Sequence, residues 1–187
     1  MAKTTADGLR LLPGDDGTLP VRIRWVDVRD IPEAIAVDGG LLYVMAAELT
    51  AYDLKDGSVA WMYEEEGVAI EADGGVVIGL DGPDVVRVIA PFNYDLRVDR
   101  RTGRLLSMGS GGDEPAAGFS PLPAPAPTQF RVSSGLEEIV GRWPDGRVAW
   151  RLAVSDPFVN PTNAVQAGDG IALVTAGQHI VVLEPVT

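Results

Sequence analysis

The side chains that could carry chemistry in this chain of 187 residues are mainly carboxylates, because the sequence holds 27 Asp and Glu residues. Two carboxylates about 5 to 10 Å apart in a cleft can hydrolyse a glycosidic bond. So many acidic residues produce such pairs by chance, and the sequence ranks none of them. We therefore name no catalytic pair and expect a protein that is not an enzyme, with a hydrolase as the least favoured alternative.

Other chemistries lack their residues. The sequence has no Cys and a single His, His179, which removes disulfides, thiolate metal sites, Cys nucleophiles and any site built from several His side chains. His179 could act as a general base, but no Ser or acid accompanies it in a catalytic motif. We predict a surface or turn histidine, just before the final strand.

Acidic turns offer the remaining candidates for a metal site. Residues 53–57, with oxygen ligands at alternate positions, look like the start of a calcium loop, but they lack the downstream Glu of that motif. Asp and Gly also favour tight turns, so we predict plain turns there and at residues 81–84. The Glu run at 64–66 is predicted to be a solvated rim. No segment has phosphate-loop spacing, and we expect neither a metal nor a cofactor.

The positioning elements are predicted to be short antiparallel strands. The 22 Gly and 14 Pro residues interrupt short apolar runs throughout the chain, which is typical of an all-β fold with tight turns. Two segments, residues 46–54 and 134–140, could instead be helical. In the second, Ser134 and Glu137 have the spacing of a capping box.

Internal repeats give the strongest signal. Similar units cover residues 36–61, residues 70–106 with an insertion at 81–94, the end of a unit at 139–150, and residues 164–183. The last unit stops before its final strand. Residues 20–25 resemble the final strands at 57–61 and 146–150, since each brings apolar residues up to a tryptophan. We therefore predict that an N-terminal strand completes the C-terminal sheet and hides an edge.

The run of an apolar residue, Asp-Gly-Gly and a strand, followed by Ala-Tyr-Asp-Leu-Lys-Asp-Gly-Ser-Val-Ala-Trp, resembles the blade repeat of pyrroloquinoline-quinone-like β-propellers. This resemblance implies four-stranded blades, with Asp53, Asp99 and Asp145 in the final hairpins. It also implies tryptophans that pack between blades, at Trp61 and Trp150, with Leu106 in the equivalent position. The expected fold is a small ring of about four blades closed by the N-terminal strand, or part of a larger oligomeric propeller. The cysteines and calcium site of the quinone-dependent members are missing.

Two segments differ from blades and are predicted to contact partners. Residues 1–19 form an expected extended arm before a propeller-like domain at 20–187, and residues 109–127 form a Gly/Pro-rich loop. The residues chosen as partner-binding are Leu9, Leu11, Leu12, Phe119, Pro121 and Pro123.

The expected function is that of a non-catalytic structural subunit in a larger assembly, with other protein subunits or copies of itself as partners. The formal net charge of −12 opposes binding to nucleic acid. No apolar run suggests a signal peptide or a membrane span, so a cytoplasmic location is expected. Arg outnumbers Lys 13 to 2, a bias of GC-rich genes, and a head or tail protein of an actinophage virion is one concrete form. The alternative is a soluble propeller that binds a small molecule or carbohydrate.

Overall fold

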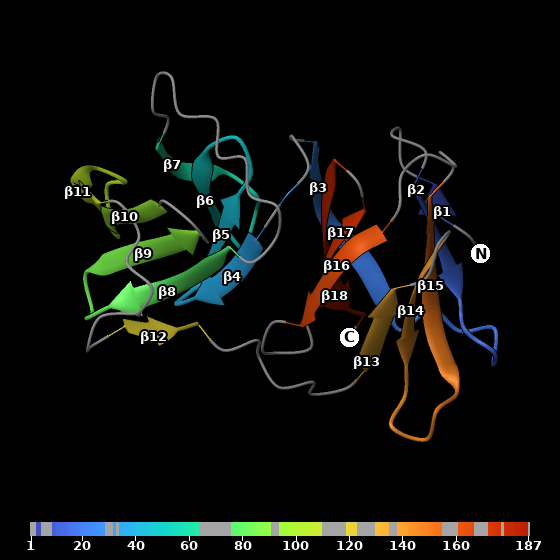
Figure 1. Ribbon diagram of the computed structural model, residues 1–187. Helices are drawn as coiled ribbons and strands as arrows, with labels where there is room; N and C mark the ends of the chain where they lie inside the picture. The colour runs from blue at the N-terminus through green and yellow to red at the C-terminus, as the bar shows by residue number, and fades with distance from the viewer. Residues whose placement is uncertain are drawn as a thin grey trace. The chain divides into compact units, whose positions relative to one another are not determined.

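The computed structural model is built from strands, and no helix occurs among the residues it describes (Figure 1). These are residues 3–4, 9–28, 32, 34–63, 76–90, 94–109, 119–122, 130–134, 138–154, 161–166, 172–176 and 178–186. The chain divides into unit 1, Met1–Ile31 with Ala124–Thr187, and unit 2, Pro32–Pro123. Each unit contains two antiparallel sheets and has its own core, which confirms the all-β prediction.

The first sheet of unit 2 is a four-stranded meander in chain order. It contains β4 (Ala34–Asp38), β5 (Leu41–Met45), β6 (Leu49–Asp53) and β7 (Val59–Tyr63). Gly39 and Gly40 join β4 to β5 with φ of 56° and 84°, the positive values that a two-residue hairpin turn requires. The helical alternative for residues 46–54 is wrong, because Leu49–Asp53 pairs on both sides within this sheet.

The second sheet of unit 2 has the order β11-β10-β9-β8-β12. Its strands are β8 (Val77–Asp81), β9 (Val85–Ala90), β10 (Tyr94–Asp99), β11 (Leu105–Gly109) and β12 (Phe119–Pro121). The predicted insertion at 81–94 is therefore wrong, since most of it is β9, a regular strand. The predicted loop at 109–127 also contains a strand, β12, which pairs with β8. Apolar residues from both sheets form one core.

The first sheet of unit 1 takes up the N-terminal segment. Its order is β1-β2-β15-β14-β13, with β1 (Lys3–Thr4), β2 (Leu9–Pro13), β13 (Arg131–Ser134), β14 (Glu138–Arg142) and β15 (Val148–Val154). β2 pairs antiparallel with β15, so the predicted arm is in this part a strand of the sheet. The helical alternative for residues 134–140 is wrong at its two ends, which lie in β13 and β14, and residues 135–137 fall outside the described part.

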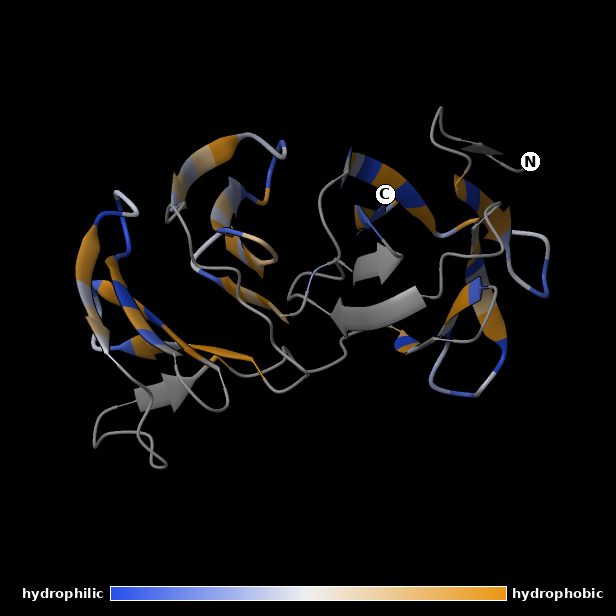
Figure 2. Ribbon diagram, turned by 45° about the horizontal axis from the view of Figure 1, so that its top comes forward, coloured by the Kyte–Doolittle hydropathy of each residue, from blue (hydrophilic) through white to orange (hydrophobic). Residues whose placement is uncertain are grey.

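The second sheet of unit 1 is completed by the N-terminal strand, as predicted. It contains β16 (Pro161–Gln166), β17 (Ala172–Ala176), β18 (His179–Pro185) and β3 (Val21–Val28) in that order. β3 pairs antiparallel with β18, and Trp25 lies opposite Val182. Residues distant in sequence thus share one sheet, and Val21, Val181 and Leu183 are buried with Leu9 and Leu11 in the core of unit 1. Figure 2 shows apolar residues along the strands and hydrophilic ones in the turns.

A register shift recurs in β7 and β11, the outer strands that end the two meanders of unit 2. Between β6 and β7 it leaves Ala60 without a partner and sets Trp61 opposite Ala51. Between β10 and β11 it leaves Leu106 without a partner and sets Ser107 opposite Arg97. An extra residue of this kind is a β-bulge. The predicted equivalence of Leu106 with Trp61 is therefore off by one residue, and Ser107 occupies the tryptophan position.

Candidate functional site

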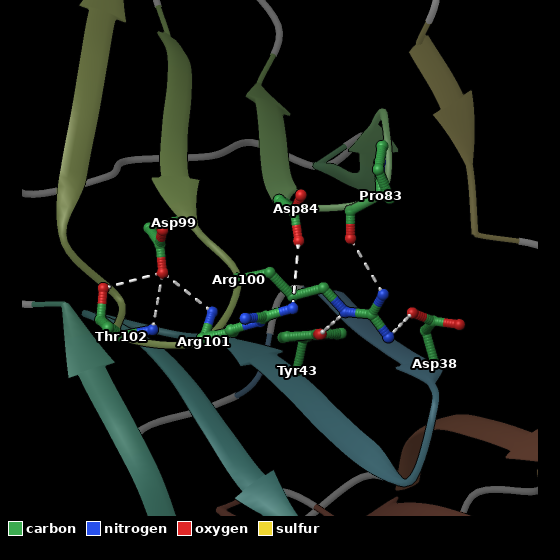
Figure 3. Close-up of polar contacts among 8 residues, drawn as sticks. All are labelled: Asp38, Tyr43, Pro83, Asp84, Asp99, Arg100, Arg101 and Thr102. Atoms are coloured by element: carbon green, nitrogen blue, oxygen red, sulfur yellow. Dashed lines mark hydrogen bonds and ion pairs between the residues drawn. The ribbon is translucent and has the colours of Figure 1, made fainter.

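Arg100 joins the two sheets of unit 2 and fixes the turn between β10 and β11. Its guanidinium forms an ion pair with Asp38, donates from Nε to the Tyr43 hydroxyl at 3.2 Å, and donates from Nη1 to the Pro83 carbonyl at 3.2 Å (Figure 3). Its backbone N–H donates to the carbonyl of Asp84 at 2.8 Å. Asp38 and Tyr43 belong to β4 and β5, so one side chain ties the hairpin of one sheet to two strands of the other.

The joint holds its groups in their ordinary charge states. Burial raises the pKa of Tyr43, although the hydrogen bond from Arg100 opposes that shift. The hydrogen bond with Tyr43 raises the pKa of Arg100, and the nearby Asp38 adds to this shift. At neutral pH the tyrosine is therefore neutral and the guanidinium is charged and paired. The cluster offers a structural cross-link and no activated base or nucleophile.

Trp61 completes this joint from β7. Its indole Nε1 donates to the carbonyl of Arg100 at 2.8 Å, and its ring centroid lies 6.0 Å from that of Tyr43. The ring packs on Gly103, where an added Cβ would come within 2.6 Å of Trp61 Cε3, and where φ is +68°. The expected packing of this tryptophan between sheets is confirmed. Gly103 is needed for both close approach and backbone conformation.

The carboxylate of Asp99 shapes the hairpin itself. Its Oδ1 accepts hydrogen bonds from the backbone N–H of Arg101 at 3.0 Å and of Thr102 at 2.9 Å, and from the Thr102 hydroxyl at 2.8 Å (Figure 3). These bonds, led by that of the Thr102 hydroxyl, lower the pKa of Asp99. Asp53 likewise accepts from the N–H of Lys55 at 2.7 Å. The predicted turn at Asp53 and the implied place of Asp99 in a final hairpin are confirmed, because both carboxylates bind the backbone of their turns.

The hairpin fixed in this way presents an exposed edge strand, β11. All five of its residues are exposed, and Leu105, Leu106 and Met108 are 40%, 44% and 41% exposed. β11 is the first strand of its sheet and pairs with β10 alone among the described strands. We call residues 105–109 the β11 edge. The sequence did not point to this site, because Leu106 was expected to be packed between blades, whereas Ser107 takes that position.

A charged row crosses the same sheet in place of an apolar one. In the first sheet of unit 2, Trp61 lies opposite Ala51 of β6, which lies opposite Tyr43 of β5, and both partners are buried in the core. In the second sheet, Ser107 takes the place of the tryptophan and lies opposite Arg97 of β10, which lies opposite Arg87 of β9. Arg87 is only 4% exposed and forms two hydrogen bonds of 2.7 Å with the carboxylate of Asp95, while Arg97 lies 3.5 Å from Asp81.

Beside this charged row, Asp95 is held as an anion paired with Arg87. Its pKa is lowered, chiefly by the hydrogen bonds from Arg87. A lowered folded-state pKa means that the stabilisation is present above the unfolded value of about 3.9 and is lost as the pH falls through the folded pKa.

We therefore expect the thermal unfolding temperature to fall on acidification below about pH 4. The Asp95→Asn variant should start lower at neutral pH and lose less over the same range, as measured by calorimetry across a pH series. Asp84→Asn is the control, since this carboxylate is 66% exposed and 3.7 Å from Arg101. An equal response of the two variants would contradict this role of the Arg87 pair.

The residues predicted to bind partners are divided between the two units. Leu9 and Leu11 are 0% exposed in the core of unit 1, so the prediction of a partner contact at these two positions is corrected: β2 buries them within the chain. Leu12 is half-buried. Phe119 and Pro121 lie in β12, opposite Asp81 and Gly79, and Pro123 lies outside the described residues.

The histidine and the remaining tryptophans have structural surroundings. His179 begins β18 and lies opposite Val28 of β3, rather than in the turn before the strand. Trp150 is fully buried in the core of unit 1. Trp143 packs against Phe130 in a tilted arrangement, with ring centroids 4.8 Å apart. Within the described ranges, no group of three or more His, Cys, Asp or Glu side chains could hold a metal ion.

The same part of the chain contains no helix long and apolar enough to span a membrane.

Comparisons with known proteins add a distant similarity. No family model matches the sequence, and the search of curated proteins gave no match. Among solved structures, the chain is similar to the crystal structure of BamB from Moraxella catarrhalis, with 14% sequence identity and a TM-score of 0.34. The match covers 98% of this chain and 53% of that one, so this chain spans about half the length of the BamB chain. The chain itself has antiparallel sheets with the four-stranded order of propeller blades.

Proposed function

We propose that this protein is a non-catalytic, protein-binding subunit of a larger assembly, and that it contacts its neighbour through the β11 edge. The observation that carries the proposal is an outer strand whose five residues are all exposed, with three large apolar side chains among them. The backbone groups on the free side of an edge strand can pair with an extended segment of another chain.

Two other edges of the chain, β3 and β12, are blunted, and this contrast supports the choice of β11 over them. β3, the outer strand of its sheet, carries Arg22, Arg24 and Asp27, and the first two pair with Glu184 of β18. β12, at the other edge of the β11 sheet, ends in Pro121, which has no N–H to donate. Natural sheets use such charges and prolines against unwanted pairing. Residues 105–109 have neither a charge nor a proline, and the one irregularity of this edge is the bulge at Leu106.

The chemistry of the described carboxylates also supports a binding role. Asp95 is paired with Arg87, Asp38 with Arg100, and Asp99 with its own turn backbone. A general acid needs a raised pKa and a general base needs access to its substrate, whereas the shifts of Asp95 and Asp99 are downward. The role of an actinophage head or tail protein is one form of the proposal and rests on composition alone.

Native size is the test of this proposal. The tagged chain, produced in its source cells, should migrate in gentle extracts as part of a species much larger than its 19.8 kDa. The Leu106→Glu variant should form less of that species. The Val59→Glu variant, changed at a residue of β7 that is 46% exposed, should form as much of it as the unaltered chain. Migration of the unaltered chain as a lone 19.8 kDa species in every extract would refute the proposal.

A further inference from the structure

We propose that the first sheet of unit 1, with the order β1-β2-β15-β14-β13 (Figure 1), binds an acidic polypeptide segment on the face turned away from its core. This surface belongs to unit 1, whereas the β11 edge belongs to unit 2, so the inference goes beyond the proposed function. The observation behind it is an excess of arginine on one sheet face, in a chain whose formal net charge is −12.

Alternation along the strands determines which side chains lie on this face. Successive strand residues point to opposite faces of a sheet, and Leu11, Ile139 and Leu152 belong to the core of unit 1. The residues that alternate with the core residues lie on the opposite face, and the strand pairing keeps them in register. Five of these residues are charged, and we call them the arginine face: Arg10, Arg131, Arg142, Arg151 and Glu138.

The irregularity of this sheet does not move Arg142 to the core side. The register shift between β14 and β15 leaves its extra residue, Ala149, in β15, and the pairing of β13 with β14 is regular throughout. A Cβ built at Gly141 would come within 2.1 Å of Cε2 of Trp150, which is buried in the core. Position 141 therefore points into the core, and its neighbour Arg142 points away from it.

The acidic groups at this face are already used by one arginine. Nη1 of Arg151 donates to the carboxylate of Glu138 at 3.0 Å, and Nη2 lies 3.5 Å from that of Asp15. The other three arginines are exposed, and none of them forms an ion pair with a carboxylate of the described residues: Arg10, Arg131 and Arg142.

Two of these arginines face each other directly. Arg131 of β13 lies opposite Arg142 of β14, a position in which Cβ atoms are about 4.5 to 5.5 Å apart. Like charges in this position destabilise a sheet, and no described carboxylate pairs with either of them. A carboxylate from another chain that lies between the two guanidinium groups would replace the repulsion with charge-assisted hydrogen bonds.

Unit 2 shows that such a face can be balanced within the chain. On the face of its second sheet that is turned away from the core, Arg87 pairs with Asp95, and Arg97 lies 3.5 Å from Asp81. The arginine-rich composition therefore does not by itself leave arginines unpaired on a sheet face. The three unpaired arginines of the arginine face are instead suited to an anionic partner.

The size of the arginine face favours a short acidic segment as that partner. Arg131 and Arg10 are separated by three strand spacings and by four residues along the strands, which corresponds to about 20 Å. An extended segment of about six residues spans this distance. A nucleic acid backbone would continue beyond it and meet the rest of the chain, which is more acidic than the chain as a whole.

The test measures the binding of a labelled eight-residue peptide, with glutamate and serine in alternation, to the purified full chain by fluorescence anisotropy. The peptide should bind at low salt and bind more weakly as salt is added, because the contacts join exposed charges. The double variant Arg131→Gln with Arg142→Gln should weaken binding at least about tenfold. Arg101→Gln is the matched control, since it removes the same charge from an arginine of unit 2 that is 85% exposed, and it should bind normally.

Thermal unfolding separates this binding role from a structural one. The Arg131→Gln variant should unfold at the temperature of the unaltered chain or slightly above it, because Arg131 faces a like charge. The same variant should bind the peptide more weakly. A lower unfolding temperature for Arg131→Gln would show that this arginine supports the fold, and would contradict the inference.

Four results of the binding experiment would overturn the inference. These are no binding of the acidic peptide, equal binding of a glutamine–serine peptide, an equal loss with Arg101→Gln, and tighter binding of a single-stranded DNA of eight nucleotides. Self-association of the chain that the double variant abolishes would also overturn it, since a second copy would then occupy the face. The β11 edge is tested independently by Leu106→Glu, so the two failures are distinguishable.

Discussion

Replacing Trp61 by alanine is expected to lower the free energy of unfolding of unit 2 by about 3 to 5 kcal/mol. The indole is 7% exposed, packs on Gly103 and donates a hydrogen bond to the carbonyl of Arg100. Removing it opens a cavity between the two sheets and leaves that carbonyl without its indole donor. Urea unfolding followed by circular dichroism measures the change.

Two further variants separate the parts of this joint. Trp61→Phe keeps an aromatic ring and loses the hydrogen bond, and should cost less than the alanine variant. Gly103→Ala should destabilise the unit from the opposite side, because its Cβ would approach the indole within 2.6 Å at a φ of +68°. A Trp61→Ala variant as stable as the unaltered chain would contradict the joint described for unit 2.

The second large effect is expected in unit 1, where Leu11→Ala should cost about 2 to 5 kcal/mol. Leu11 is 0% exposed in the core and lies opposite Leu152 of β15. Three of the four tryptophans, Trp25, Trp143 and Trp150, belong to unit 1, so their fluorescence during denaturation reports on this unit.

Arg10→Ala is the control for this prediction. Arg10 is the neighbouring residue in β2 and is exposed, so its replacement should change stability by no more than about 0.5 kcal/mol. If residues 9–13 were an arm lying free of the core, Leu11→Ala and Arg10→Ala would be equally mild. That outcome would contradict the place of β2 in the sheet.

The repeat pattern predicted the fold correctly where all the strands and turns of a repeat unit could be recognised in the sequence. Residues 36–61 show alternation and turn glycines, and they form β4 to β7 with few surprises. The closing strand could also be predicted, because the unit at 164–183 lacked its last strand and Trp25 marked a candidate. β3 and β18 are paired as that argument required.

Other elements carried too weak a local signal. β2 has only Leu9 and Leu11 as fully buried residues, and nothing local shows that β15 lies beside it. The tryptophan position in β11 was missed because an apolar residue was chosen by type. Counting four residues from the turn glycine would have found it, since Gly57 precedes Trp61, and Gly103 precedes Ser107, by the same interval.

The pairing of Arg87 with Asp95 depends on strand register, which short-range patterns do not fix.

The most direct test of the central claim, that the β11 edge is the contact surface of this protein, is hydrogen exchange measured on the dilute chain and on the assembled form. The amides of residues 105–109 that face away from β10 should exchange quickly in the dilute chain and slow strongly on assembly. Slower exchange confined to other strands, with residues 105–109 unchanged, would contradict the account.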